Sequence, residues 1–345
     1  MRSLSPQYRG VLPILGAILA IVMLASIRFG AVPIAVADMS GALRGMFGNR
    51  ATLSLDQRIF LEIRLPRAIL TAMVGASLAV GGALMQALFR NPIVEPGLVG
   101  TSAGAAFGAA LYFVLGASLK VHLGSWTLPL AACAGGALST WLVFRLSDAH
   151  RTGRTSVVAL LLTGIAINAL FLSGVGFLSY IARDPQARSI TFWNLGTLSG
   201  ASWSSVMIVG TSTILCTIAS LRHAQPLNAL MLGEEEAGYL GVDVRRLKAM
   251  VLLVNVVMVA VATAFTGVIA FVGLVVPHLL RLLRGADNRF LILGGALLGG
   301  IILGLADLVA RLLLAPAELP IGIVTSVVGV PVFLLLLRQR RYYFL

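Results

Sequence analysis

Apolar runs of about 20 residues follow one another along nearly the whole chain, separated by short gaps rich in Arg, Pro, Gly and Asp. A helix of about 20 apolar residues crosses the roughly 30 Å hydrocarbon core of a bilayer, and a chain in lipid must satisfy its backbone hydrogen bonds internally. Composition agrees, because 58% of the 345 residues are hydrophobic and only 11% are charged. The sequence therefore predicts an all-α polytopic membrane protein, with residues 1–345 forming a single transmembrane domain.

Ten candidate transmembrane spans have the required length and polar boundaries. They cover residues 11–31, 66–89, 97–116, 127–147, 156–181, 204–221, 248–266, 267–284, 290–312 and 318–337. The seventh and eighth are the hardest to separate, because only Thr266-Gly267 offers a turn between them. The first span follows Arg2 and Arg9 as a secretory signal would, but its length favours a helix that is retained.

The chain is strongly basic, with a formal net charge of +13, and its cations gather in the gaps between apolar runs. Cytoplasmic flanks of membrane spans carry an excess of Lys and Arg. An N-terminus in the cytoplasm assigns most of the 26 cations to that side, and an even number of spans returns the C-terminus there. We expect both termini in the cytoplasm, an outer loop over residues 32–63, and no nucleic-acid partner.

Three arginines stand at the predicted outer ends of spans. Arg64 and Arg67 begin the second span, and Arg311 ends the ninth, four residues after Asp307. Residues four apart share a helix face, so Asp307 and Arg311 are expected to form an ion pair. Exposed arginines bind carboxylates through two parallel hydrogen bonds, which predicts docking of a partner on Arg64, Arg67 and Arg311. Snorkelling to the membrane interface is the alternative.

Residues 232–246, reading LGEEEAGYLGVDVRR, form an acidic stretch between two apolar runs. Glu234, Glu235 and Glu236 favour the start of a helix, which Gly233 and Gly241 would bound. A short rigid helix transmits a push, so this cytoplasmic region, residues 222–247, is predicted to couple the chain to a partner protein. The two lysines both follow leucine, so the chain lacks a phosphate-binding Gly-Lys-Ser/Thr loop and energy must come from elsewhere.

An enzyme alternative rests on Gly100-Thr101-Ser102-Ala103-Gly104, which matches the nucleophile-elbow pattern G-x-S-x-G. No strand is predicted before it, which excludes a hydrolase elbow and leaves an intramembrane serine protease using Ser102 and His278. Cys133 and Cys216 lie inside apolar runs without metal-ligand spacing, so no metal site is expected.

Three long segments, collinear over nearly the whole chain, carry a family resemblance: RLPRAILTAMVGASLAVGGALMQALFRNPIVEPGLVGTSAGA (64–105), GVIAFVGLVVPHLLRLL (267–283) and ADLVARLLLAPAELPIGIVTSVVGVPVF (306–333). They resemble the permease subunits of type II ABC importers for iron-siderophores, haem and vitamin B12, the FecCD and BtuC kind. The resemblance implies a BtuC-like fold of about ten helices in a non-catalytic inner-membrane subunit.

Partners follow from the resemblance. It implies a homodimer, two cytoplasmic ATPase subunits that use ATP and Mg, and a periplasmic substrate-binding protein; no cofactor is expected on this chain. The resemblance assigns coupling to the ATPase to Gly233, Glu234, Glu235, Glu236, Ala237, Leu240 and Gly241. It assigns docking of the binding protein to Arg64, Arg67 and Arg311. The cytoplasmic gate is expected near the turn before the fifth span, at Thr152, Thr155 and Ser156.

The cargo is predicted from residues 178–203, whose SYIARDPQARSITFW portion is closer to haem-importer permeases than to the siderophore or cobalamin branches. Tyr180, Phe192 and Trp193 offer flat apolar contact for a porphyrin along the substrate path. An interfacial aromatic belt is the alternative for these side chains. A ferric-siderophore or cobalamin importer, and more remotely a gradient-driven secondary transporter with buried acidic relays, remain open.

Overall fold

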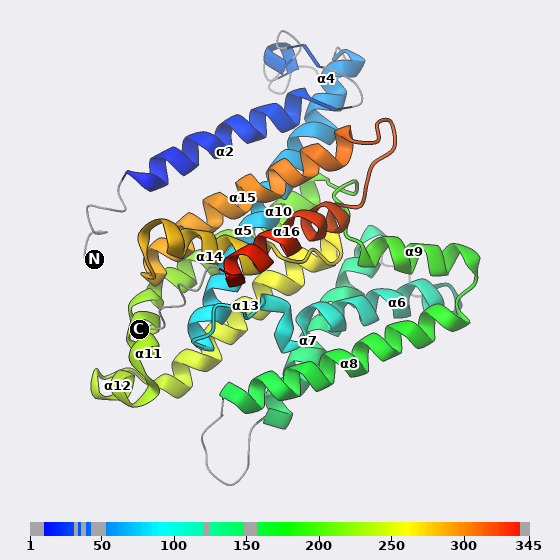
Figure 1. Ribbon diagram of the computed structural model, residues 1–345. Coiled ribbons are helices and arrows are strands. Elements are labelled where there is room, and N and C mark those ends of the chain that lie inside the picture. Colours follow the sequence, from blue (N-terminus) through cyan, green and yellow to red (C-terminus); the bar gives the residue numbers. More distant parts are fainter. Residues whose placement is uncertain are drawn as a thin grey trace.

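Every regular element that the structure describes is a helix. The computed structural model describes residues 10–30, 34–35, 39–42, 53–119, 124–147 and 157–338 (Figure 1). Seven of the described helical stretches are long and apolar enough to cross a membrane, and Thr101–Gly116 and Ile321–Leu336 are shorter apolar helices. The prediction of an all-α polytopic membrane protein is confirmed.

The helices run in the following order: α2 Val11–Arg28, α4 Leu55–Ile59, η2 Phe60–Arg64, α5 Leu65–Leu88, η3 Pro96–Val99, α6 Thr101–Leu119, η4 Gly124–Trp126, α7 Thr127–Ser147, α8 Val157–Ile181, α9 Asp184–Asn194, α10 Trp203–Arg222, α11 Ala224–Leu232, α12 Glu234–Tyr239, α13 Val244–Thr266, α14 Val272–Arg284, α15 Asn288–Leu312 and α16 Ile321–Arg338.

The eighth predicted span is wrong as a full crossing. The turn at Thr266-Gly267 is present, since α13 ends there and Gly267 has a φ of 71°. Residues 267–271 then continue without helical structure, and α14 has only 13 residues. A helix of that length reaches about 20 Å, short of a hydrocarbon core of roughly 30 Å. Hydropathy alone does not reveal such a break, because the non-helical residues 267–271 are themselves apolar.

Three helical segments lie where the sequence predicted connections. Residues 55–63 of the expected 32–63 loop form α4 and most of η2, which lead directly into α5; Ser54 and Gln57 form the capping box that starts them. Helix α9 separates α8 from α10, and α11 precedes α12. These elements are short or amphipathic, so a search for 20-residue apolar runs passes over them.

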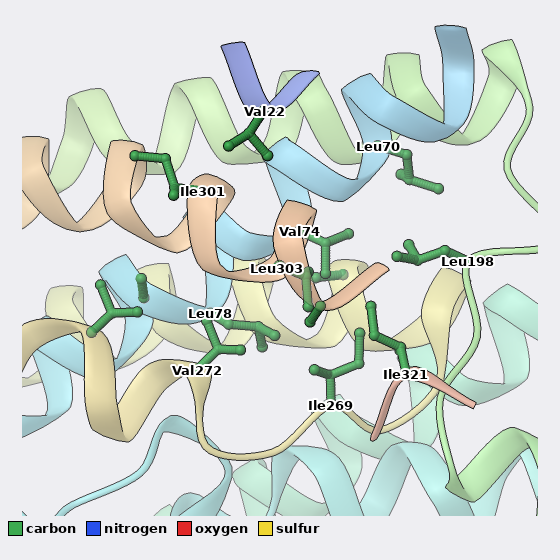
Figure 2. Packing of buried hydrophobic residues seen from close by; sticks show 14 of the residues in the cluster. Val22, Leu70, Val74, Leu78, Leu198, Ile269, Val272, Ile301, Leu303 and Ile321 are labelled. Carbon is green, nitrogen blue, oxygen red and sulfur yellow. The ribbon is translucent and has the colours of Figure 1, made fainter. Parts of the chain in front are cut away.

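Helix α5 is the centre of the bundle, and α15 packs along it at very short range (Figure 1). A methyl group built on Gly299 would lie 2.2 Å from the Gly75 carbonyl oxygen, so only glycine permits this approach. Small residues serve the same purpose in many membrane helix pairs. Apolar side chains of both helices contribute to the main hydrophobic core, which contains Val74 and Leu78 of α5 and Leu303 of α15 (Figure 2). Gly104 and Gly108 bring α6 equally close to α7.

Helix α14 contains Pro277, which has no N–H to donate to the Gly273 carbonyl one turn earlier. The Gln86 side chain of α5 replaces that donor, with its Nε2 lying 3.3 Å from both Gly273 O and Leu274 O. Its Oε1 accepts a hydrogen bond from Arg281. A proline kink is tolerated in an apolar bundle when a neighbouring side chain satisfies the freed carbonyl.

The start of α14 is tied to the loop after α5. Phe271 has a φ of 68°, an uncommon conformation for a bulky residue, and its N–H donates to Glu95 Oε1 at 3.3 Å. Burial raises the pKa of the Glu95 carboxyl, and the hydrogen bond from Phe271 opposes that rise. Asn255 of α13 donates to Pro96 O at 3.3 Å. Side chains thus fasten the two breaks in the helical structure, before η3 and before α14, to neighbouring elements.

Candidate functional site

Five charged side chains gather where α2 ends, α5 begins and α15 ends; we call them the arginine cluster. Its members are Arg64, Arg67, Asp307, Arg311 and Glu318. Asp307 is fully buried and binds two arginines, Arg67 Nη2 through Oδ1 and Arg311 Nε through Oδ2, each at 2.9 Å. The predicted ion pair between Asp307 and Arg311 is confirmed. Its second arginine partner comes from a different helix, 240 residues away in the sequence.

The arginines of the cluster also bind the end of α2. Arg311 Nη2 donates to Ser26 O at 3.0 Å, and Arg64 Nη1 donates to Phe29 O at 2.6 Å. The last carbonyl groups of a helix receive no hydrogen bond from an N–H group of the same helix, and they carry partial negative charge. Arginine side chains therefore close the C-terminus of α2 and hold it against α5 and α15.

The expectation that Arg64, Arg67 and Arg311 are exposed is wrong. Their exposed fractions are 8%, 8% and 5%. Arg67 binds Asp307 through Nε and Nη2, and its third nitrogen, Nη1, donates to Glu318. Both carboxylate oxygens of Glu318 lie 2.9 Å from Nη1. Glu318 was not predicted, although a lone acid between Pro316 and Pro320 in a short apolar loop is a visible signal. The four-residue spacing predicts that Asp307 and Arg311 are neighbours but does not indicate that the cluster is buried.

At the other end of α15 the acidic stretch forms the predicted short helix. Gly233, with a φ of 145°, precedes α12, and Gly241, with a φ of 82°, follows it. Ala237 is fully buried and fixes α12 to the bundle, while Tyr239 is 88% exposed and Leu240 is 64% exposed. Helix α12 therefore presents an apolar tip beside exposed carboxylates, a surface suited to a protein partner.

An ion pair joins α12 to α13. Lys248 Nζ lies 2.8 Å from both carboxylate oxygens of Glu234. Beside it is an open hollow of about 1260 Å³, lined by α12, the first turns of α13 and parts of α7 and α8, with Arg90, Arg145 and Arg245 on its walls. The predicted gate residues Thr152, Thr155 and Ser156 lie outside the described residues.

The three aromatic residues predicted for the substrate path separate into two groups. Tyr180, near the end of α8, is 88% exposed, and Phe192 on α9 is 55% exposed. Phe192 lines a shallow hollow of about 450 Å³ with Asp184 and Arg188. Trp193 is 7% exposed and packs in an apolar cluster with Ile190 and Leu178, so its side chain faces the core and not the surface. Adjacent residues on a helix point about 100° apart, which explains the split.

The structure agrees with the exclusion of a hydrolase elbow. A nucleophile elbow needs a strand before the serine, whereas η3 precedes Gly100, and Ser102 lies in the first turn of α6. The G-x-S-x-G pattern here supplies small residues for close packing, since a methyl group on Gly100 would lie 2.4 Å from Ser139 Oγ. Helix packing accounts for the motif without catalysis.

The helical bundle, its broken elements and its exposed acidic helix define the class, a multi-pass membrane permease. The chain belongs to the FecCD transport family, whose model matches residues 18–339. It is thus a transport permease of the ABC importer class. Members of such a family are non-catalytic, so ATP hydrolysis by this chain is not expected.

Similar proteins differ in their cargo. The chain is 43% identical to the hemin transport system permease protein HmuU of Yersinia pestis, over 97% of both chains. It is 41% identical to the vitamin B12 import system permease protein BtuC of Salmonella paratyphi A, over 84% of this chain and 87% of the relative. A solved inward-facing structure assigned to a metal-chelate type ABC transporter superposes with a TM-score of 0.83 at 31% identity, covering 96% and 99% of the two chains.

Proposed function

We propose that this chain is the membrane subunit of an ATP-driven importer whose cargo is haem. The observation that carries the proposal is the similarity to a hemin permease along 97% of both chains, which includes the segment between α8 and α10. Cobalamin import is one alternative, supported by a relative of nearly equal identity, and ferric-siderophore import is the other, supported by the similarity to a metal-chelate type transporter. A gradient-driven carrier is disfavoured, because Asp307 is already occupied by Arg67 and Arg311.

The proposed complex contains two copies of this chain, two cytoplasmic ATPase subunits and a periplasmic substrate-binding protein, in a bacterial inner membrane with both termini in the cytoplasm. Helix α12 would enter a cleft of the ATPase. Its exposed Glu235 and Glu236 favour a basic rim on that cleft, and Tyr239 and Leu240 favour an apolar floor. ATP binding and hydrolysis would then move α12 and alternate the access of the path.

The binding protein would dock near the arginine cluster, at the opposite end of α15. Because Arg67 is occupied by Glu318, a carboxylate of the binding protein reaches it only by replacing Glu318. Glu318 is 42% exposed at its side chain, so the exchange requires movement of one surface group and no opening of the core. Among the aromatic candidates, Tyr180 and Phe192 remain for contact with a porphyrin.

The test is transport in proteoliposomes that hold this chain with its ATPase, supplied with the cognate binding protein. ATP-dependent accumulation of haem, with no uptake of a ferric siderophore or cobalamin, would support the proposal. Accumulation of another cargo would keep the importer and reject haem. The matched control uses an ATPase variant that binds but does not hydrolyse ATP, and the absence of any ATP-dependent uptake would reject the importer itself.

A further inference from the structure

Helix α12 is connected to the rest of the bundle through two neighbours, α11 and α13, against which it packs. Helix α11 in turn packs against α5 and α15, the central pair. Its apolar side is buried, with Ala224, Leu227 and Leu230 each at most 1% exposed. A displacement of α12 therefore reaches the membrane helices by two routes, through α13 and through α11.

The route through α11 ends in a compact set of hydrogen bonds that we call the Asn228 joint, formed by Asn228, Asp287 and Asn288. Asn228 Oδ1 accepts from the backbone N–H of Asn288 at 2.9 Å and from Asn288 Nδ2 at 2.8 Å. Asn228 Nδ2 donates to Asp287 Oδ1 at 3.1 Å. Asp287 is also the N-cap of α15, accepting from Arg289 N at 2.8 Å. Three hydrogen bonds thus fix α11 to the start of α15, two of them at its first residue, Asn288, and one at its N-cap, Asp287.

The route through α13 depends on a less directional side-chain contact. Besides the short link from α12 to α13, in which Val242 N donates to Ala237 O at 2.9 Å, it contains the ion pair between Lys248 and Glu234, and the Glu234 side chain is 38% exposed. A lysine ammonium is a point charge on a flexible stem, so the pair tolerates changes in angle and is screened by salt. Asn288 is 2% exposed, and hydrogen bonds of this kind are lost after small displacements. Of the side-chain contacts on the two routes, those of the Asn228 joint are therefore the more sensitive to displacement.

Helix α15 extends the joint across the bundle. Its 25 residues give a length of about 37 Å, from the joint at Asn288 to the arginine cluster at Asp307 and Arg311. The close contact of Gly299 with Gly75 keeps α15 against α5, and Arg67 of α5 binds Asp307. Close-packed helices shift as units rather than deform, so a shift at one end of α15 appears at the other.

We propose that Asn228 is a positioning residue that transfers movement of α12 into α15, and thereby links the ATPase surface to the arginine cluster. The inference rests on the proposed function of α12 as the ATPase contact. A purely structural role, in which Asn228 only caps the start of α15, makes a different prediction. In that case loss of the side chain lowers the amount of folded complex but leaves the cargo moved per ATP unchanged.

The experiment measures cargo transported per ATP hydrolysed in proteoliposomes holding the full complex, together with its unfolding temperature. Asn228→Ala is expected to lower that ratio by about fivefold or more, the scale of a typical coupling between sites. Asn228→Asp keeps the acceptor for Asn288 but places a carboxylate against Asp287, and should lower it similarly. Adding Asp287→Asn exchanges donor and acceptor and should restore the ratio, since Asn is also a good N-cap.

Ser220→Ala is the control, because it removes a buried hydrogen bond near the same end that stays within α10, from Ser220 Oγ to Cys216 O. An unchanged ratio in Asn228→Ala, an equal fall in Ser220→Ala, or failure of the exchanged pair to restore coupling would each overturn the inference. If Asn228→Ala does not assemble, Asn228→Asp and its exchanged pair decide. A wild-type complex without ATP-driven uptake would reject the proposed function instead, so the two failures are distinct.

Discussion

The two ends of α15 hold charged groups in opposite ways. At the arginine cluster, Arg67 and Arg311 share a fully buried carboxylate, and their other donors bind Glu318 and backbone carbonyls. At α12, carboxylates face outward and one of them pairs with Lys248 across a partly exposed contact. Burial makes the first region rigid and expensive to break, and exposure leaves the second free to bind and move.

The largest expected effect comes from Asp307→Ala. It leaves two buried arginines without their common partner, so we expect a loss of about 3–5 kcal/mol in the free energy of unfolding. Thermal unfolding of the purified protein in detergent measures it. Asp243→Ala, which removes the exposed N-cap of α13, is the matched control and should lose about 1 kcal/mol. Equal losses in the two variants would show that burial does not separate the regions.

The next effect tests the helix pair that connects the two ends. In Gly299→Ala the new methyl group meets the Gly75 carbonyl, and we expect a loss of about 1–3 kcal/mol from separation of α5 and α15. Gly176→Ala on α8 is the control, because nothing lies within 4 Å of its added methyl group. That variant should gain up to about 1 kcal/mol from helix propensity. If the two variants shifted the unfolding temperature in the same direction relative to the wild-type protein, the close contact would be refuted.

A smaller effect is expected for Glu318→Gln, at the edge of the arginine cluster. The change removes the charge facing Arg67 but keeps an oxygen acceptor, and the side chain is 42% exposed. We expect a loss of about 1 kcal/mol, because solvent screens the pair. Binding of the cognate binding protein, measured by titration, should strengthen if Glu318 competes for Arg67. Unchanged or weaker binding would argue against that exchange.

The smallest effect is expected for Lys248→Met at the α12 end. Methionine can fill the buried volume of the lysine stem, and the lost ion pair is worth at most about 1 kcal/mol. A double-mutant cycle with Glu234→Gln measures the pair itself, and its coupling energy should fall further as salt is raised. A coupling as large as that between Asp307 and Arg67 would remove the contrast between the two ends.

Much of the architecture follows from local sequence. Apolar length predicts the long spans, four-residue spacing predicts the pair between Asp307 and Arg311, and glycines at 233 and 241 predict the bounds of α12. Each of these depends on residues close together in the chain, whose geometry in a helix is fixed. The break between α13 and α14 was only partly predictable, because the turn shows in Gly267 but the extended apolar residues after it look helical.

The environment of the same residues was not predictable. Arg64 and Arg67 stand at the predicted outer end of a span, where exposed docking groups are expected, yet the structure buries both and supplies Phe29 O and Glu318 as partners. Trp193 lies beside Phe192 but faces the core. Gln86 donates to the Gly273 carbonyl that Pro277 leaves without a donor, although Gln86 lies 187 residues earlier than Gly273 in the sequence. No local pattern near either residue indicates this contact. Burial depends on which helices become neighbours, and that is a property of the whole bundle.

By itself, the sequence determined that this chain is a membrane protein, where most of its long apolar helices lie, and which family it belongs to, because these depend on runs and motifs within one segment. Only the tertiary structure decided which charges are occupied and which are available. Asp307, Arg67 and the Asn228 joint acquire their roles from partners that lie 59 to 251 residues away. In an apolar interior an unpaired polar group is costly, so packing decides its partner and the partner decides its function.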